Sequence, residues 1–340
     1  MKRKEKDEQL AAHLPGLLQY HQMMLSDGVR NRLLYEAIKR HVTSETNFLD
    51  VGAGTGVWAI LAAQLGAKRV VAIEIEEALI PIIFRHAQEN GVAHRIEIIH
   101  ANSDDVKIRG RFDVIVSELF GSNALGEQTI KSFVALRNRF LAADGVLIPQ
   151  KLALFAVPVH MEDSVCGNPA GLPIKSEFLK SLKLNYSLNA SLDERRKIKF
   201  LGEPQPLVEI DFRSVKAAPP LRQLSASWKI ENLAEVNGFA VFNYSTFTDD
   251  LVMDNFASKS WGTAVYEFQP FAQTSGEVVF ELNMDEKKSI WSVHLASEPD
   301  VKRQNYSPGF ALTRLKLAQQ MTPYRKFNPP KDKKTSPVKT

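Results

Sequence analysis

The chain has 340 residues, of which 44% are hydrophobic and 24% are charged, and its formal net charge is +4. This length suits two domains, and the hydrophobic content is ordinary for a globular protein with a full core. So mild a charge does not imply nucleic-acid binding. The single cysteine, Cys166, excludes an internal disulfide and offers no metal cluster. No apolar stretch reaches the roughly 18 residues that span a bilayer.

The N-terminal stretch Lys2–Glu8 is charged throughout and contains no apolar core of a secretory signal. We therefore expect a cytoplasmic protein. Residues 1–19 are treated as an N-terminal segment that precedes the first domain.

Residues 20–149 alternate apolar runs with helical stretches, a pattern typical of a doubly wound parallel α/β sheet. Pro81 falls near the first turn of the helix after the second strand, and Asn90-Gly91 closes that helix. The five expected strands lie near residues 47–51, 69–74, 95–100, 112–117 and 145–149.

The first of these strands runs into a glycine-rich turn, Asp50-Val51-Gly52-Ala53-Gly54-Thr55-Gly56. Its three glycines let the backbone approach a ligand closely. The spacing is G-x-G-x-G, with Val57 where a dinucleotide fold has its third glycine. Glu74 ends the second strand, where an acid can accept hydrogen bonds from ribose hydroxyls. Together these features favour an adenosyl ligand without phosphates, S-adenosylmethionine, over NAD.

Two glutamates, Glu118 and Glu127, lie in the loop after the fourth strand, where Gly121 and Gly126 let the chain turn back. Two carboxylates in one loop repel each other, and each raises the pKa of the other unless a cation separates them. A planar guanidinium, with five donors, suits such a fork best. We call this pair the guanidinium clamp.

Beyond Pro149 the sequence changes to short alternating runs, typical of an antiparallel β-barrel or sandwich. We place this second domain at residues 150–322, with a more helical, polar insert at about 161–200. The tail, residues 323–340, is rich in lysine and proline and is expected to be disordered.

With these features the chain resembles the protein arginine N-methyltransferase family, over about His21 to Pro299. The segment Tyr20–Arg30 is similar to the N-terminal helix motif of this family. The resemblance implies that Met24 lines the cofactor and that Arg30 holds the cofactor's carboxylate. The resemblance places the cofactor against Asp50, Gly52, Gly54, Gly56 and Glu74, and its adenine against Ser103 and Asp104. Glu118 and Glu127 match the two glutamates that hold the substrate arginine, in a form closest to the subgroup that makes only monomethylarginine.

Two departures from the family accompany these matches. Its Thr-His-Trp loop falls at Lys259-Ser260-Trp261, so that Ser260 replaces the histidine and Trp261 remains as a wall of the arginine pocket. Its aromatic-rich N-terminal helix is replaced by Ala11, Ala12 and Pro15, so the lid over the cofactor is either reshaped or supplied by Tyr20 and Leu18.

The resemblance implies S-adenosylmethionine-dependent methylation of arginine in proteins, with Glu118 as the anchor and Glu127 as the base if one acts. Asp27 positions a glutamate or the substrate, or simply caps a helix. The insert at 161–200 would be an arm that reaches a second subunit, which implies a homodimer. Three alternatives stay open: a methyltransferase for small guanidino compounds, a cofactor-binding partner subunit with weak catalysis, and a nicotinamide oxidoreductase.

Overall fold

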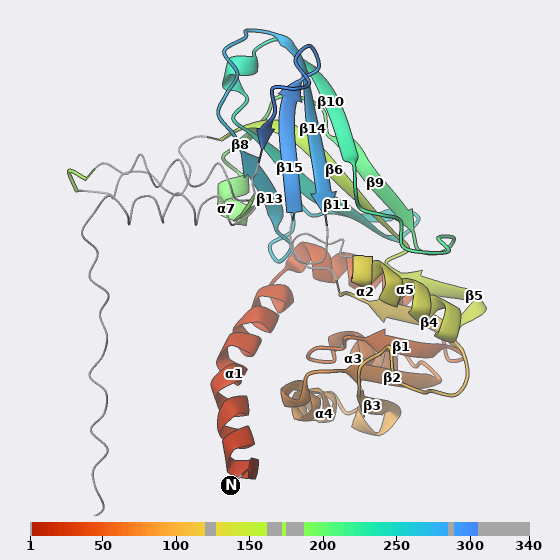
Figure 1. Cartoon of the computed structure of the whole chain (residues 1–340). Coiled ribbons are helices and arrows are strands. Elements are labelled where there is room, and N and C mark those ends of the chain that lie inside the picture. The colour runs from red at the N-terminus through yellow and green to blue at the C-terminus, as the bar shows by residue number, and fades with distance from the viewer. Residues whose placement is uncertain (1, 120–126, 162–171, 175–186, 285–288, 305–340) are drawn as a thin grey trace, which may run out of the picture.

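The computed structural model describes residues 2–119, 127–161, 172–174, 187–284 and 289–304. A parallel sheet with helices forms the lower part of Figure 1, and antiparallel strands form the upper part. This confirms the expected α/β domain followed by an antiparallel one.

The first part is a five-stranded sheet in the order β3-β2-β1-β4-β5, with every neighbouring pair parallel. The three central strands, β1, β2 and β4, are buried almost throughout, which explains their apolar sequence. The bounds are β1 (Asn47–Val51), β2 (Arg69–Glu74), β3 (Ile96–His100), β4 (Phe112–Ser117) and β5 (Leu141–Ile148). The strand order reverses between β1 and β4, and open α/β sheets bind ligands outside the carboxyl ends of such strands.

Helices and short 3-10 turns connect these strands as the sequence predicts. Pro81 lies in the first turn of α4, and Asn90 caps its end before Gly91, whose φ is +71°. Their bounds are α2 (Gly28–His41), α3 (Val57–Gln64), η1 (Glu77–Leu79), α4 (Ile80–Glu89), η2 (Ala93–Arg95) and α5 (Glu127–Phe140).

The N-terminal segment is a single helix, α1 (Lys2–Leu25), which continues through Pro15. The expected boundary between residues 19 and 20 therefore falls inside a helix. In Figure 1 the N-terminal half of α1 extends away from the rest of the molecule.

The second part contains two antiparallel sheets, in the orders β7-β13-β11-β6-β8 and β10-β14-β15-β16, with β12 paired to β11 and β9 to β6. Trp228 and Phe280 pack against Phe239 between them, with ring centroids 5.2 and 4.8 Å away. The bounds are β6 (Lys151–Met161), β7 (Ser187–Ala190), β8 (Ile198–Phe200), β9 (Gln205–Asp211), β10 (Leu224–Ile230), β11 (Gly238–Thr248), β12 (Leu251–Asp254), β13 (Thr263–Glu267), β14 (Gly276–Met284), β15 (Ser289–Leu295) and β16 (Arg303–Gln304), with η3 (Leu233–Glu235) between β10 and β11.

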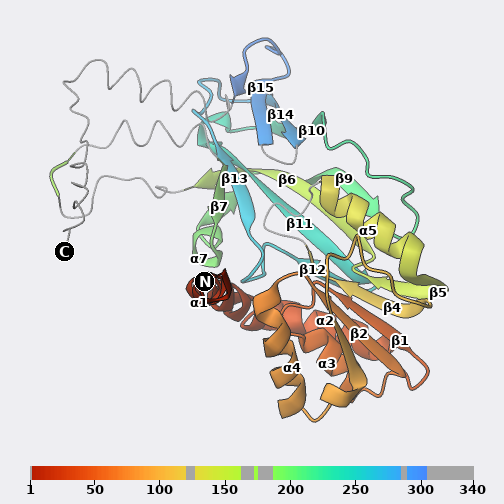
Figure 2. The ribbon, with the colours of Figure 1, turned by 60° about the horizontal axis from the view of Figure 1, so that its bottom comes forward.

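The two parts meet along α2 and the ends of β11 and β12, as Figure 2 shows from a second side. Arg40 of α2 forms an ion pair with Asp250, with Nη1 2.6 Å from Oδ1. Arg137 of α5 donates to the Phe212 carbonyl oxygen at 2.6 Å. This placement brings residues of the antiparallel part to the carboxyl edge of the parallel sheet.

The insert at 161–200 is described only in part, so the expected helical arm stays a prediction. Apart from the four-residue α7 (Leu192–Arg195), its described elements are strands, because β7 and β8 extend the seven-stranded sheet. Residues 162–171 and 175–186, and the whole predicted tail at 323–340, lie outside the described residues.

Within the described ranges, no helix is both long enough and apolar enough to cross a bilayer. The same residues contain no group of three or more histidine, cysteine or acidic side chains that could hold a metal ion.

Candidate active site

The turn after β1 uses glycine for its backbone conformation and for its lack of a side chain. Gly52, Gly54 and Gly56 have φ of +72°, +60° and +81°, the left-handed region that other residues rarely adopt. A Cβ on these glycines would lie 2.6 Å from Leu119, 2.8 Å from His21 and 2.7 Å from Ile83, respectively. Both requirements explain why glycine occupies these three positions, and the close approach of a ligand to this backbone stays a prediction.

Glu74 lies beside this turn with its carboxylate almost fully buried. Its Oε2 accepts from the Gly54 N–H at 2.7 Å, and its Oε1 accepts from the N–H groups of Ile75 and Glu76, both at 2.9 Å. A carboxylate has about four acceptor positions, so one remains for a hydroxyl donor. The expected ribose contact at Glu74 is compatible with this arrangement.

A cavity of about 300 Å³ lies between the glycine turn, Glu74 and α1. Helix α1 covers it with Leu17, Tyr20, His21 and Met24. The lid is therefore supplied by α1, with Tyr20 as expected and with Leu17 in place of Leu18, which is 42% exposed and does not line the cavity. The other walls include Arg30, Asp50, Gly52, Gly54, Trp58, Ile75, Leu79, Glu118 and Leu119.

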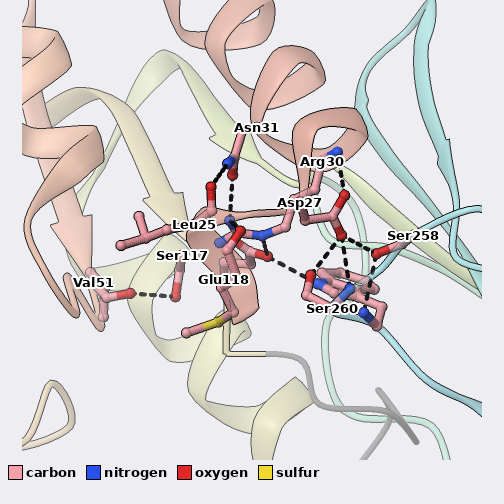
Figure 3. A network of polar contacts seen from close by, with 11 residues as sticks. Leu25, Asp27, Arg30, Asn31, Val51, Ser117, Glu118, Ser258 and Ser260 are labelled. Atoms are coloured by element: carbon pink, nitrogen blue, oxygen red, sulfur yellow. Dashed lines mark hydrogen bonds and ion pairs between the residues drawn. The ribbon is translucent and has the colours of Figure 1, made fainter. Parts of the chain in front are cut away.

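Glu118 follows β4 directly, at the switch point of the sheet, where the Ser117 hydroxyl donates to the Val51 carbonyl oxygen at 3.2 Å. The Arg30 guanidinium donates to both oxygens of Glu118, from Nε to Oε1 and from Nη2 to Oε2 (Figure 3). The Trp261 indole Nε1 also donates to Oε1, at 3.0 Å. Three segments far apart in the sequence thus converge on one carboxylate.

Arg30 is itself almost completely buried. Its Nη1 donates to Asn31 Oδ1 at 2.7 Å and to the Met24 carbonyl oxygen at 3.3 Å, and its guanidinium carbon lies 5.6 Å from the Trp58 ring centroid. Arg30 lines the cavity, which agrees with the expectation that it faces the cofactor. Its pairing with Glu118 was not expected.

Asp27 joins the helix that carries Arg30 to the loop that carries Trp261. Its Oδ1 accepts from the Arg30 N–H at 3.2 Å and caps α2. Its Oδ2 accepts from Ser258 Oγ at 2.5 Å, from Ser260 N at 2.9 Å and from Ser260 Oγ at 2.8 Å. Asp27 and Ser260, two of the expected site residues, therefore bind each other and do not line the cavity. The geometry gives both of them a positioning role.

Burial acts to raise the pKa of the Asp27 carboxyl, but the hydrogen bonds from Ser258, Ser260 and Arg30 outweigh it and hold that pKa below its ordinary value. We expect Asp27→Asn to lower the free energy of unfolding by about 2–3 kcal/mol, because asparagine still caps a helix but loses charge-assisted hydrogen bonds. Urea denaturation would measure this, with Asp193→Asn as the exposed control. An equal loss in both variants would contradict the positioning role.

Asp50 lies at the base of the cavity and is fully buried. Its Oδ2 accepts from the Ala59 N–H at 3.1 Å. Burial raises the pKa of Asp50 to about 7; the Ala59 hydrogen bond opposes this rise, and the nearby Glu74 and Glu118 add to it. The carboxyl therefore holds its proton more tightly in the folded protein than in the unfolded chain.

This shift makes stability depend on pH. Between about pH 4 and pH 7 the folded state binds more protons than the unfolded state, so Asp50 lowers stability as pH rises and adds no further change above pH 7. We expect Asp50→Asn to remove this decline in the free energy of unfolding, which amounts to roughly a few kcal/mol. Urea denaturation of both proteins at pH 4–8 would show it. Parallel pH profiles would contradict the assignment.

Gly56, an expected cofactor contact, is not among the residues that line the cavity. Glu127 begins α5, but its side chain lies outside the described part of the chain, so the second half of the guanidinium clamp stays a prediction. Ser103 and Asp104 follow β3 but do not line the cavity, and the Ser132 hydroxyl donates to Asp104 at 3.3 Å. Their contact with adenine also stays a prediction.

No role in the cavity was predicted for His21, yet this side chain lies against Gly54 in the cavity wall. Burial and the nearby Arg30 lower its pKa, and Glu74 opposes this change. Its place between Tyr20 and Met24 in the N-terminal motif was the available signal. Leu119, which contacts Gly52, follows Glu118 directly and was also missed.

Comparisons with known proteins agree with this geometry. A family model described as ribosomal protein L11 methyltransferase (PrmA) matches residues 32–149. A probable protein arginine N-methyltransferase 6.2 of Oryza sativa subsp. indica is 28% identical over 229 residues, which cover 65% of this chain and 58% of that protein. The protein arginine N-methyltransferase PRMT10 of Oryza sativa subsp. japonica is 35% identical over 150 residues, 42% of this chain and 38% of that protein. The chain thus spans little more than half the length of the first of these relatives.

Two solved structures share the fold. The Trypanosoma brucei PRMT1 enzyme-prozyme heterotetrameric complex with AdoHcy gives a TM-score of 0.68 at 20% identity, with 81% of this chain and 92% of that chain covered. Arabidopsis thaliana protein arginine methyltransferase 10 gives 0.65 at 20% identity, with 83% and 96% covered. The fold is that of a class I methyltransferase with a second, antiparallel domain. Within that class, the comparisons confirm the resemblance to the protein arginine N-methyltransferase family.

Proposed function

We propose that this protein transfers a methyl group from S-adenosylmethionine to a guanidino nitrogen of arginine in proteins. One observation carries the proposal: the buried Glu118 carboxylate, at the switch point of the sheet, holds a guanidinium through both of its oxygens. This guanidinium belongs to Arg30, and its binding supports the proposal because a substrate arginine carries the same group. Bidentate arginine–carboxylate pairs combine strength with geometric specificity.

The cavity beside Glu118 fits an adenosyl cofactor. Glycines without room for a Cβ line one wall, Glu74 has an acceptor position for a hydroxyl, and Arg30 can receive a carboxylate. S-adenosylmethionine supplies a methyl group that its sulfonium activates for displacement. The protein's task is to bind and align the arginine that accepts it.

Arginine is a poor nucleophile because it stays protonated and its lone pairs are delocalised. In this proposal Glu118 anchors the guanidinium and Glu127, the predicted second member of the guanidinium clamp, draws charge toward the nitrogens it contacts or acts as base. Charges about 4 Å apart at an effective dielectric near 20 interact by about 4 kcal/mol. Alignment of the reacting atoms can contribute roughly 7–11 kcal/mol of the barrier.

The alternatives are weaker on this structure. The alternative of a partner subunit with weak catalysis was motivated by Ser260, which replaces the family's histidine. The Ser260 hydroxyl still holds this loop to Asp27, and Trp261 of the same loop still donates to Glu118. The chemistry of a nicotinamide oxidoreductase does not require a buried carboxylate that binds a guanidinium. A small guanidino compound differs from a protein arginine only beyond the group that Glu118 holds, so product analysis must separate these two.

We also propose a homodimer in the cytoplasm. The support for the dimer is the family resemblance together with the T. brucei relative, whose structure is a heterotetrameric complex. Sedimentation equilibrium of the full chain tests it, and a monomer at micromolar concentration would contradict it.

The central test of the proposed activity is labelled methyl transfer from S-adenosylmethionine to an arginine-rich protein mixture, followed by hydrolysis and chromatography of the amino acids. We expect labelled methylarginine, and monomethylarginine alone would support the subgroup suggested by the sequence. Cofactor binding without labelled protein arginine, but with label on free guanidino compounds, would favour the small-substrate alternative. Binding of NAD instead of the adenosyl ligand would overturn the proposal.

A further inference from the structure

Arg30 occupies the position on Glu118 that the proposed function requires for the substrate arginine. Its Nε and Nη2 face the two carboxylate oxygens, as the side chain of a bound arginine would do. The pair is buried, with side-chain exposures of 6% for Arg30 and 7% for Glu118. An arginine of the same chain is present at a high effective concentration, so a substrate arginine must compete with it.

The donors of Arg30 are nearly all in use. A guanidinium has five N–H donors. Two hydrogen bonds go to Glu118, and two more from Nη1 go to Asn31 Oδ1 and to the Met24 carbonyl oxygen. A single N–H on Nη2 is left. Arg30 therefore cannot grip a second carboxylate with two parallel hydrogen bonds while it holds Glu118 in this way.

The contacts around the pair restrict where Arg30 can move. Met24 and Asn31 hold Nη1 on one side, and Trp58 lies 5.6 Å away on the cavity wall. Glu118 in turn keeps its hydrogen bond from Trp261, whose loop is attached to Asp27. Glu118 is thus fixed in place for an incoming guanidinium once Arg30 lets go, and the cavity is the open side toward which Arg30 can turn.

We propose that Arg30 is an internal competitor that keeps the arginine site closed until the carboxylate of the cofactor draws it away from Glu118. Substrate arginine then binds well only after the cofactor. This inference rests on the proposed function, because it assumes that Glu118 receives the substrate guanidinium. It adds to that function an order of binding, with Arg30 as the residue that sets it.

The test compares two adenosyl ligands that differ in the carboxylate. S-adenosylhomocysteine carries the amino-acid part, whereas 5′-methylthioadenosine occupies the nucleoside site without a carboxylate. The probe is a synthetic peptide with one arginine among alanines and serines, and the same peptide with lysine measures non-specific binding. Isothermal titration calorimetry gives the peptide affinity with no ligand, with S-adenosylhomocysteine and with 5′-methylthioadenosine.

We expect S-adenosylhomocysteine to strengthen binding of the arginine peptide about tenfold or more. A tenfold gain corresponds to a site that is open in about one molecule in ten without the ligand and in all molecules with it. Saturating 5′-methylthioadenosine should leave the affinity unchanged. Equal affinity with and without S-adenosylhomocysteine, or an equal gain from both ligands, would overturn the inference.

A variant gives an independent readout. Arg30→Met should bind the arginine peptide without any cofactor, with the affinity of the cofactor-loaded natural protein, whereas Arg32→Met, an exposed change on the same helix, should keep the cofactor dependence. Arg30→Met that folds but still needs S-adenosylhomocysteine contradicts the inference. Failure of the proposed function has a different appearance: S-adenosylhomocysteine does not bind, or no labelled arginine forms in the transfer assay.

Discussion

Glu118→Gln is expected to lower kcat/KM for methyl transfer to protein arginine by about two to four orders of magnitude. The change keeps the shape of the side chain but removes the charge that a guanidinium needs in a buried site. Removing one partner of a buried ion pair costs about 3–5 kcal/mol, which corresponds to this loss in rate. Labelled transfer at subsaturating substrate measures it. Glu127→Gln is expected to behave in the same way.

Binding of S-adenosylhomocysteine should persist in Glu118→Gln, because Arg30, Glu74 and the glycine turn are unchanged. Glu89→Gln, at the exposed end of α4, is the matched control and should turn over normally. Since Arg30 loses its counter-charge in Glu118→Gln, thermal unfolding must show that this variant is folded at the assay temperature. Normal turnover by a folded Glu118→Gln would contradict the role of Glu118 as anchor.

Gly54→Ala is expected to weaken binding of S-adenosylhomocysteine by about 1–3 kcal/mol, or roughly 5- to 150-fold. Its φ is +60°, and a Cβ there would lie 2.8 Å from the His21 ring in the cavity. The methyl group therefore takes up space that the ligand needs and pushes His21 aside. Calorimetric titration with S-adenosylhomocysteine gives the affinity.

Gly91→Ala separates this effect from backbone strain. Gly91 has a similar φ of +71°, but a Cβ there would meet nothing within 4 Å. Both variants should lose about 1–2 kcal/mol of stability from the left-handed conformation, and only Gly54→Ala should lose affinity. If the two variants lost affinity equally, the effect would come from strain and not from the cavity.

The parallel sheet could be predicted because its information is local. Buried strands such as β1 and β2 read as continuous apolar runs, and glycine turns mark where they end. The start of the fifth strand was less clear: β5 begins at Leu141, whereas the apolar pattern suggested residue 145, since Ala142, Ala143 and Asp144 interrupt it. A helix that continues through Pro15 also contradicts the local signal.

The site was predicted where it depends on single elements, as for Glu74 and the glycine turn. It could not be predicted where it depends on contacts between segments far apart in the sequence. Arg30 and Glu118 are 88 residues apart, and Asp27 and Ser260 are 233 residues apart. Packing of α2 against the end of β4 brings Arg30 to Glu118, and the position of the antiparallel domain on α2 brings Ser260 to Asp27; no spacing in the sequence encodes either contact.

The most direct test of the central claim is methyl transfer to two peptides that are identical except for one residue, arginine or lysine. Each is incubated with the full-length protein and labelled S-adenosylmethionine, and the labelled residue is located by mass spectrometry. The account predicts label on the arginine side chain alone. Equal label on both peptides, or none on either while S-adenosylmethionine is bound, would contradict it.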